Sequence, residues 1–213
     1  RMSNIKNETV DWKKLASKEE IQKTIDSLKK NGFFAELAKD TEDVKRKVLD
    51  IIPKGSEVMN MTSVTLETLE IAKEIAKSER YNDVRKKFES MIGNEKQKRE
   101  MKRIGSAPEY TIGSVHAITQ NGEILIASNT GSQLPAYAYG SDKVIFVVGT
   151  QKIVKDLDEG IKRIYEHSLP LESERAKKAY GVPGSSVNKI LIINKEVSPD
   201  RIHIIFVNQV LGF

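Results

Sequence analysis

The segment from Gly113 to Gly149 constrains the fold more strongly than any other part of the sequence. Two short apolar runs, residues 115–119 and 123–128, flank the dipeptide Asn121-Gly122. Because this dipeptide suits the two positive φ angles of a type I′ turn, the segment predicts a β-hairpin. A further apolar run over 143–148 predicts a buried strand that ends at Gly149.

A loop of small polar residues joins the hairpin to that strand. Backbone amides and hydroxyls concentrated beside buried strands are suited to a fixed anionic ligand. We therefore expect ligand contacts from the loop and from the hairpin turn, and the residues concerned are Thr130, Gly131, Ser132, Gln133 and Gly122. A connecting loop that merely needs glycine is the alternative interpretation, and the residues alone leave it open.

Hydroxyl side chains also follow the strand predicted over 57–61. Thr62, Ser63 and Thr65 stand where a helix over about 62–78 must begin. A strand that runs into a helix N-terminus places free backbone amides at the carboxyl edge of a sheet, where open α/β sheets bind ligands. These residues are therefore predicted as ligand contacts, although the pattern is also that of ordinary helix caps.

The remaining pattern predicts an α/β fold with a mostly parallel sheet. Ser17 and Glu20 form a capping box for a helix over 18–30, and the last strand, 201–208, is apolar on both faces and is expected inside the sheet. A second small-residue loop precedes a strand over 189–194 and supplies three predicted ligand contacts, Gly184, Ser185 and Ser186. We expect an N-terminal arm over 1–17 that docks through Trp12, followed by one domain over 18–213.

Composition excludes several classes of protein. The 213 residues contain no cysteine, so the chain itself cannot hold an iron–sulfur cluster or use a thiol nucleophile. No apolar stretch approaches the roughly 20 residues of a membrane span, and the N-terminus lacks the pattern of a signal peptide. The expectation is a cytoplasmic protein with no membrane partner and no cofactor of its own.

The formal charge of +5 is concentrated in residues 80–103, where nine basic residues stand against four acidic ones. The segment is predicted to be helical, and a solvated basic face is the favoured interpretation. Binding of nucleic acid or an acidic partner is the alternative, but Tyr81 and Phe88 are the segment's aromatic residues and no helix-turn-helix pattern surrounds it.

Motifs of catalysis are sparse. His116, His167 and His203 lack the paired spacing of metal ligands, so no metal site is expected. His203 is expected in the core, whereas His116 lies near the hairpin and could face a pocket. No Walker loop, GxGxxG or serine nucleophile elbow occurs. Glu123, directly after the hairpin turn, is the candidate acid or base.

Several segments, taken in order, resemble the LUD family, which is named for lactate utilisation. They are Ile52-Pro53-Lys54-Gly55-Ser56-Glu57-Val58 with Thr62-Ser63, Ala117-Ile118-Thr119-Gln120-Asn121-Gly122, Pro135 ahead of the strand 143–148, Lys152-Ile153-Val154-Lys155-Asp156-Leu157, and the strand 200–207. The resemblance implies a three-layer α/β domain of the class shared by ribose phosphate isomerases, glucosamine phosphate deaminases, CoA transferases and formyltetrahydrofolate cyclo-ligases. It also implies a cluster-free component that works beside iron–sulfur partners.

One departure from the related CoA transferases bears on mechanism. Those enzymes use the glutamate of a Ser-Glu-Asn-Gly motif as the nucleophile, whereas this chain has Thr119-Gln120-Asn121-Gly122. An amide cannot form the acyl-carboxylate anhydride, so a covalent CoA-transferase mechanism is not expected.

These inferences together predict an accessory or ligand-binding subunit of lactate-type redox metabolism. The expected ligand is a small anionic organic acid, a phosphate or a CoA-type molecule, held among the three loops at 62–65, 129–133 and 184–188. The expected partners are iron–sulfur oxidoreductase subunits and a second copy of the chain. The alternatives are a sugar-phosphate isomerase or formyltetrahydrofolate cyclo-ligase that uses Glu123, and a nucleic-acid or partner-binding module that uses residues 80–103.

Overall fold

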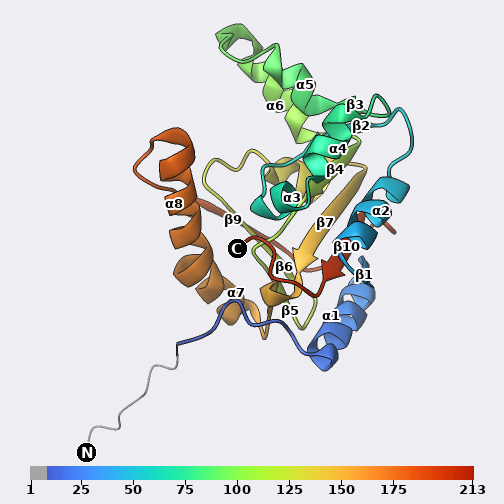
Figure 1. The fold of residues 1–213 in the computed structure, drawn as a ribbon, viewed down its shortest axis with the longest axis vertical. Helices are drawn as coiled ribbons and strands as arrows, with labels where there is room; N and C mark the ends of the chain where they lie inside the picture. Colours follow the sequence, from blue (N-terminus) through green and yellow to red (C-terminus); the bar gives the residue numbers. More distant parts are fainter. Residues whose placement is uncertain (1–8) are drawn as a thin grey trace, which may run out of the picture.

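The computed structural model describes residues 9–213 and contains a six-stranded parallel sheet, so the predicted α/β fold is confirmed (Figure 1). Its strand order is β1-β10-β7-β4-β2-β3. The strands are β1 (Phe34–Ala38), β10 (Ile202–Val207), β7 (Lys143–Gly149), β4 (Tyr110–Gly113), β2 (Glu57–Asn60) and β3 (Asn82–Asp83). The last strand of the chain, β10, lies inside the sheet as its two apolar faces predict.

A second sheet has the order β8-β5-β6-β9 and contains the predicted hairpin. The strands are β8 (Ile153–Val154), β5 (Ala117–Thr119), β6 (Ile124–Ser128) and β9 (Lys189–Ile193). The predicted type I′ turn is wrong, because Gly122 has a positive φ of 85° but Asn121 does not. Gly122 N–H donates to the Thr119 carbonyl, and Thr119 N–H donates to the Glu123 carbonyl, which is the pattern of a tight turn followed by a glycine bulge.

Eight α-helices are described. They are α1 (Lys18–Lys30), α2 (Thr41–Ile51), α3 (Val64–Thr68), α4 (Ile71–Lys77), α5 (Val84–Glu89), α6 (Lys98–Ser106), α7 (Leu157–Arg163) and α8 (Leu169–Tyr180). Short 3-10 or π turns complete the described elements, at η1 (Glu95–Gln97), η2 (Ala136–Gly140), η3 (Thr150–Lys152) and η4 (Ile164–Ser168). The capping box of α1 forms as predicted, since Ser17 Oγ accepts from Glu20 N–H and Glu20 accepts from Ser17 N–H.

Two predicted helices are interrupted. The helix expected over 62–78 is divided into α3 and α4, because Glu70 adopts a left-handed φ of 56° between them. The basic segment 80–103 is not one helix either, because the turns around Gly93 separate α5 from α6. These two helices form an arm that projects at the top of Figure 1.

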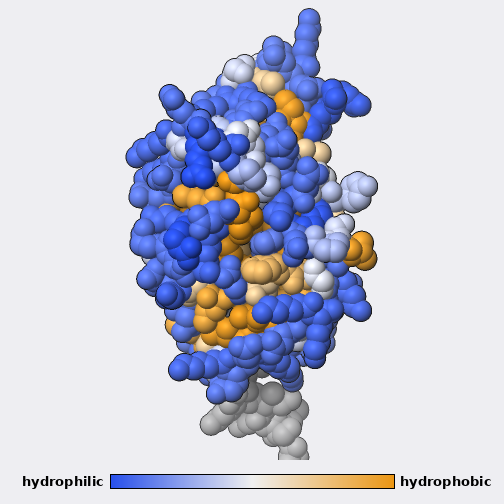
Figure 2. Space-filling view, turned by 90° about the vertical axis from the view of Figure 1, so that its right-hand side faces the viewer, coloured by the Kyte–Doolittle hydropathy of each residue, from blue (hydrophilic) through white to orange (hydrophobic). Residues whose placement is uncertain are grey.

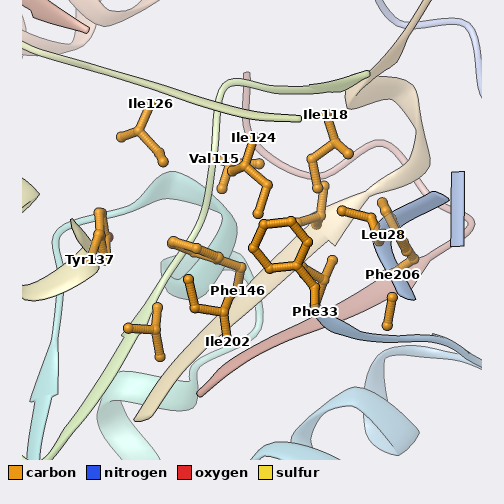
Figure 3. Close-up of a cluster of buried hydrophobic side chains, with 14 of the residues drawn as sticks. Leu28, Phe33, Val115, Ile118, Ile124, Ile126, Tyr137, Phe146, Ile202 and Phe206 are labelled. Carbon is orange, nitrogen blue, oxygen red and sulfur yellow. The ribbon is translucent and has the colours of Figure 1, made fainter. Parts of the chain in front are cut away.

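The main sheet is buried on both faces because its central strands alternate apolar side chains. In β7, Phe146 points into a cluster that also contains Leu28 of α1 and Ile118 and Ile124 of the hairpin (Figure 3). The adjacent Ile145 faces the other way, into a cluster formed with α2, α3 and α4. This alternation gives three layers: helices α2–α4, the six-stranded sheet, and the hairpin sheet with α1.

The central strands of the hairpin sheet, β5 and β6, are buried on both faces, whereas its edge strand β9 is partly exposed. Leu125 and Ala127 point away from the main sheet and pack beneath α7, where Trp12 also contacts the cluster. The predicted N-terminal arm lies partly outside the described residues, which begin at residue 9. Within the described part, its tryptophan is partly buried against this cluster.

The edge of the main sheet at β1 is partly apolar. Phe34 and Leu37 of this strand are exposed by 38% and 44%. The face on the right-hand side of Figure 1 carries an apolar band among polar areas (Figure 2). Nothing in the structure tests whether a second copy covers this face, so the expected homo-oligomer stays a prediction.

The connection from α1 to β1 gives a stability prediction that separates backbone strain from steric conflict. Gly32 and Gly55 have nearly the same positive φ, 89° and 86°, but a Cβ on Gly32 would lie 2.0 Å from the Glu196 carbonyl oxygen while one on Gly55 would meet nothing within 4 Å. Gly55→Ala should therefore cost about 1 kcal/mol from strain alone. Gly32→Ala should cost about 1–3 kcal/mol more, because backbone must move. Urea unfolding measures both values, and equal losses would contradict the assigned contact.

Candidate functional site

A cavity of about 870 Å³ lies at the carboxyl ends of the strands, and the three predicted loops meet there. Its walls include Met61 after β2, Ser114 after β4 and Lys152 after β7. Residues from α8 and from the α5–α6 arm complete the lining. Parallel strands bring their carboxyl ends to one edge of a sheet, which is where open α/β folds bind ligands.

Most of the residues predicted as ligand contacts line this cavity. They are Thr62, Ser63, Thr65, Thr130, Gly131, Ser132, Gln133, Ser185 and Ser186. The sequence places these residues on three separate loops, and the structure brings them together around one space. Their contact with a ligand stays a prediction.

Three other candidates lie outside the cavity lining. Gly122 packs against α1, where an added Cβ would lie 2.8 Å from the backbone of Ser27. Gly184 is outside the lining although its neighbour Ser185 is part of it. The Glu123 carboxylate accepts a hydrogen bond from Thr119 Oγ1 within the hairpin and does not face the cavity. Glu123 is therefore poorly placed to act as an acid or base on a molecule bound there.

Lys152 is the main site residue that sequence reasoning missed. It is 2% exposed, and its Nζ donates to the Val115 carbonyl at 2.9 Å and to Thr65 Oγ1 and Ser114 Oγ at 3.2 Å each. No carboxylate in residues 9–213 lies within 4 Å of this ammonium group. Three neutral acceptors orient the group but leave its charge without a counter-ion.

The two hydroxyl partners of Lys152 are oriented to accept. Ser114 Oγ donates its own proton to the Val147 carbonyl at 2.7 Å, and Thr65 Oγ1 donates to the Leu211 carbonyl at 3.3 Å. Burial, together with the charge of Arg163, lowers the pKa of Lys152 to about 7. The amine therefore changes its charge near neutral pH.

His116 is a neutral hydrogen-bond donor beside this lysine. Its Nδ1 accepts from the Ala127 N–H at 3.0 Å, so the neutral ring carries its proton on Nε2. Burial, with the charges of Lys152 and Arg163, lowers the pKa of His116 to about 3. The imidazole lines the cavity and stays uncharged at any pH near neutrality.

Arg163 adds a second buried cation behind His116. It is fully buried, and its Nη1 donates to the His116 carbonyl at 2.6 Å and to Ser168 Oγ at 3.3 Å. Its Nε and Nη2 have no hydrogen-bond partner in the part of the chain that the structure describes. Burial lowers the pKa of Arg163 to about 10. The floor of the cavity thus lies in a positive electrostatic field, which favours an anion.

Metal-binding clusters and membrane-spanning helices are both absent from the described residues. Between residues 9 and 213, no group of three or more His, Asp or Glu side chains is arranged to hold a metal ion. Within the same range, no helix is both long and apolar enough to cross a bilayer.

A family model for the LUD domain matches residues 21–207 of the chain. The chain belongs to the LUD domain family. The match runs from within α1 to the end of β10 and includes the three predicted loops that line the cavity. No curated protein matches this LUD-domain chain in sequence.

Solved structures agree with the α/β architecture. The LUD-domain chain is similar to a DUF162 family protein from Deinococcus radiodurans, with a TM-score of 0.56, 12% identity, and 91% of this chain and 99% of that chain covered. At this identity the similarity shows the fold alone. A weaker match is eIF2B delta from Chaetomium thermophilum, with a TM-score of 0.32, 17% identity, and 67% of this chain and 55% of that chain covered. Another is ribose 5-phosphate isomerase from Plasmodium falciparum, with a TM-score of 0.35, 15% identity, and 76% of this chain and 80% of that chain covered.

The buried charge of Lys152 predicts a pH-dependent difference in stability. In the unfolded chain this amine keeps its proton up to about pH 10, whereas the folded chain releases it near pH 7. The unfolded state therefore binds more protons between these values, and stability rises with pH there. The free energy of unfolding of the wild type, minus that of Lys152→Met, should increase by up to about 1.4 kcal/mol per pH unit.

Urea unfolding at several pH values from about 6 to 9.5 measures this difference. Lys155→Met removes an exposed lysine from the same segment and serves as the control. A difference between wild type and Lys152→Met that stays constant with pH would contradict the assigned environment of Lys152.

Proposed function

We propose that this LUD-domain chain binds an organic anion, a carboxylate or a phosphate ester, as a ligand-binding component of lactate-type redox metabolism. The observation that supports this most directly is the ammonium group of Lys152, which is buried at the cavity floor with three neutral acceptors and no carboxylate partner among the described residues. A buried, unpaired charge is costly, and a bound anion would remove much of that cost.

The surrounding groups suit the same ligand. The anion would take the charge of Lys152 and a hydrogen bond from His116 Nε2–H, and the loop hydroxyls of Thr130 and Ser132 would contact the rest of the molecule. Because Lys152 is 2% exposed, a charge-assisted bond to its ammonium group is stronger than it would be in water. The role is binding, since Glu123 lies away from the cavity.

The metabolic part of the proposal rests on the family. LUD domains are named for lactate utilisation, and the sequence has no cysteine, so any iron–sulfur cluster of such a system would lie on partner subunits. Genes for iron–sulfur oxidoreductase subunits next to the gene for this chain would support that role. A conserved neighbourhood of unrelated metabolism would contradict it.

No observation favours either alternative function, the enzyme that uses Glu123 or the binding module that uses residues 80–103. An isomerase or cyclo-ligase that uses Glu123 would need this carboxylate in the cavity, where it does not lie. In the basic segment, Lys98 pairs with Glu95, Arg103 with Glu100 and Lys87 with Glu57, which neutralises part of the charge that nucleic acid would need.

The binding proposal predicts a ligand whose affinity depends on Lys152. A thermal-shift screen of lactate, pyruvate, sugar phosphates, CoA esters and folates should find at least one stabilising compound. Lys152→Met should weaken its binding at least about tenfold, because a charge-assisted bond is lost, and Thr130→Val or Ser132→Val should weaken it about three- to tenfold. Lys155→Met is the control. A compound that binds equally well to Lys152→Met would place the anion elsewhere.

The same site predicts proton uptake on binding. At pH 8 the free Lys152 is mostly neutral, because its pKa is about 7, and an anion favours the charged form. Calorimetry in buffers of different ionisation enthalpy should therefore detect proton uptake above pH 7, with affinity falling up to about tenfold per pH unit. Lys152→Arg keeps the charge and should remove this dependence. Proton release on binding would contradict the assignment.

A further inference from the structure

The cavity is larger than a compact acid requires. Its volume of about 870 Å³ lies near the upper end of the range of about 300–1,000 Å³ that is typical of sites for drug-sized ligands. Lys152, Ser114 and Thr65 occupy only one part of the lining. A three-carbon acid held by Lys152 would leave most of the space to water, so the remaining walls are informative about the ligand.

The walls beyond Lys152 are largely apolar. The side chains concerned are Met59, Met61, Phe88, Val115, Ile126, Tyr137, Ile164, Leu169 and Val187. They come from both sheets, from the arm and from η4 and α8, so they belong to several walls of the cavity instead of forming one patch. Apolar walls of this kind bind a hydrocarbon or aromatic body by removing it from water.

A second unpaired cation stands on the arm side of the cavity. Arg85 is half-buried, its Nε donates to the Asn60 carbonyl at 2.7 Å, and its Nη2 donates to Thr62 Oγ1 at 3.0 Å. No carboxylate within the described range lies within 4 Å of its guanidinium group. These two bonds fix the guanidinium at the cavity wall and leave its charge available.

The other arginine of the lining differs in this respect. Arg175 of α8 is neutralised by Glu172, with two bonds of 2.8 Å, and its guanidinium lies 5.6 Å from the centre of the Tyr180 ring. Lys102 is exposed to solvent on the arm. Of these three cations on the arm and α8, Arg85 is the one that is half-buried and has no carboxylate partner among the described residues.

We infer that the ligand is an organic anion with two anionic groups, one held by Lys152 and the other by Arg85, and with an apolar body that packs against the remaining walls of the cavity. The inference rests on the proposed function, because it assigns the first anionic group to Lys152. The second group is a carboxylate or a phosphate, since the planar guanidinium binds either with two parallel bonds.

The test compares straight-chain carboxylates with one and two anionic ends. Monocarboxylates from butanoate to dodecanoate, the matching α,ω-dicarboxylates and the matching ω-phosphocarboxylates are titrated into the protein by calorimetry at fixed ionic strength. The two series with a second anionic group separate a carboxylate preference from a phosphate preference at Arg85. The variants are Arg85→Met, Lys152→Met and, as a matched control, Lys102→Met.

At the best chain length, the second anionic group should increase affinity at least about tenfold, as expected for a charge-assisted bidentate bond. Arg85→Met should abolish this gain and keep the affinity for the monocarboxylate, which also shows that the variant is folded. Lys102→Met should keep the gain. Equal affinities for the two kinds of acid, a gain that survives Arg85→Met, or tightest binding by the shortest acid would overturn the inference.

The design also separates this inference from the proposed function. If monocarboxylates bind and Lys152→Met weakens them, but the second anionic group adds nothing, the proposed function holds and the two-ended ligand is wrong. If Lys152→Met leaves every affinity unchanged, or if no acid binds, the proposed function itself fails together with this inference.

Discussion

The chemistry of the cavity depends on one unusual burial, the ammonium group of Lys152, which lies three residues after the end of the central strand β7. The strand before it, from Val144 to Val148, is fully buried on both faces, so the backbone that delivers this lysine cannot move toward solvent. Its charge is held by oxygens from the ends of two other segments, at Thr65 and Ser114. Such an arrangement stores an electrostatic cost in the free protein, and a bound anion would release it.

The two sheets explain why polar loops from distant parts of the chain meet at this lysine. The parallel sheet brings the ends of β2, β4 and β7 to one edge, and the hairpin sheet lies across its face through Ile118 and Ile124. The loop that leaves β6 therefore enters the same space from the opposite wall. The central strands of both sheets are buried on both faces and closely packed, so the loops that extend from them are held in fixed positions.

The sequence predicts the features whose causes are local. The capping box at Ser17 and Glu20 specifies α1, and the rule that parallel strands bring their carboxyl ends to one edge places the loop at 62–65 at the ligand-binding edge of the main sheet. The loop at 129–133 follows β6 of the hairpin sheet, so it reaches the same space through the packing of one sheet on the other. Features with distant causes escape prediction. Lys152 follows a buried strand, which is a signal, but its burial depends on Thr65, 87 residues away, and on Ser114, 38 residues away. The break between α3 and α4 at Glu70 is likewise not predictable, because residues 62–78 contain no glycine or proline.

The charges of the cavity argue for binding over proton chemistry. Glu172 is the acidic side chain in the described lining, and Arg175 holds it with two hydrogen bonds. His116 does not accept a proton near neutral pH, because burial and the charges of Lys152 and Arg163 lower its pKa to about 3, and its Nδ1 already accepts a backbone N–H. Proton exchange would therefore fall on Lys152, the same group that must keep its charge to hold an anion. In the proposed site Lys152 holds the anion in its charged form, so it would not act as a base while the ligand is bound.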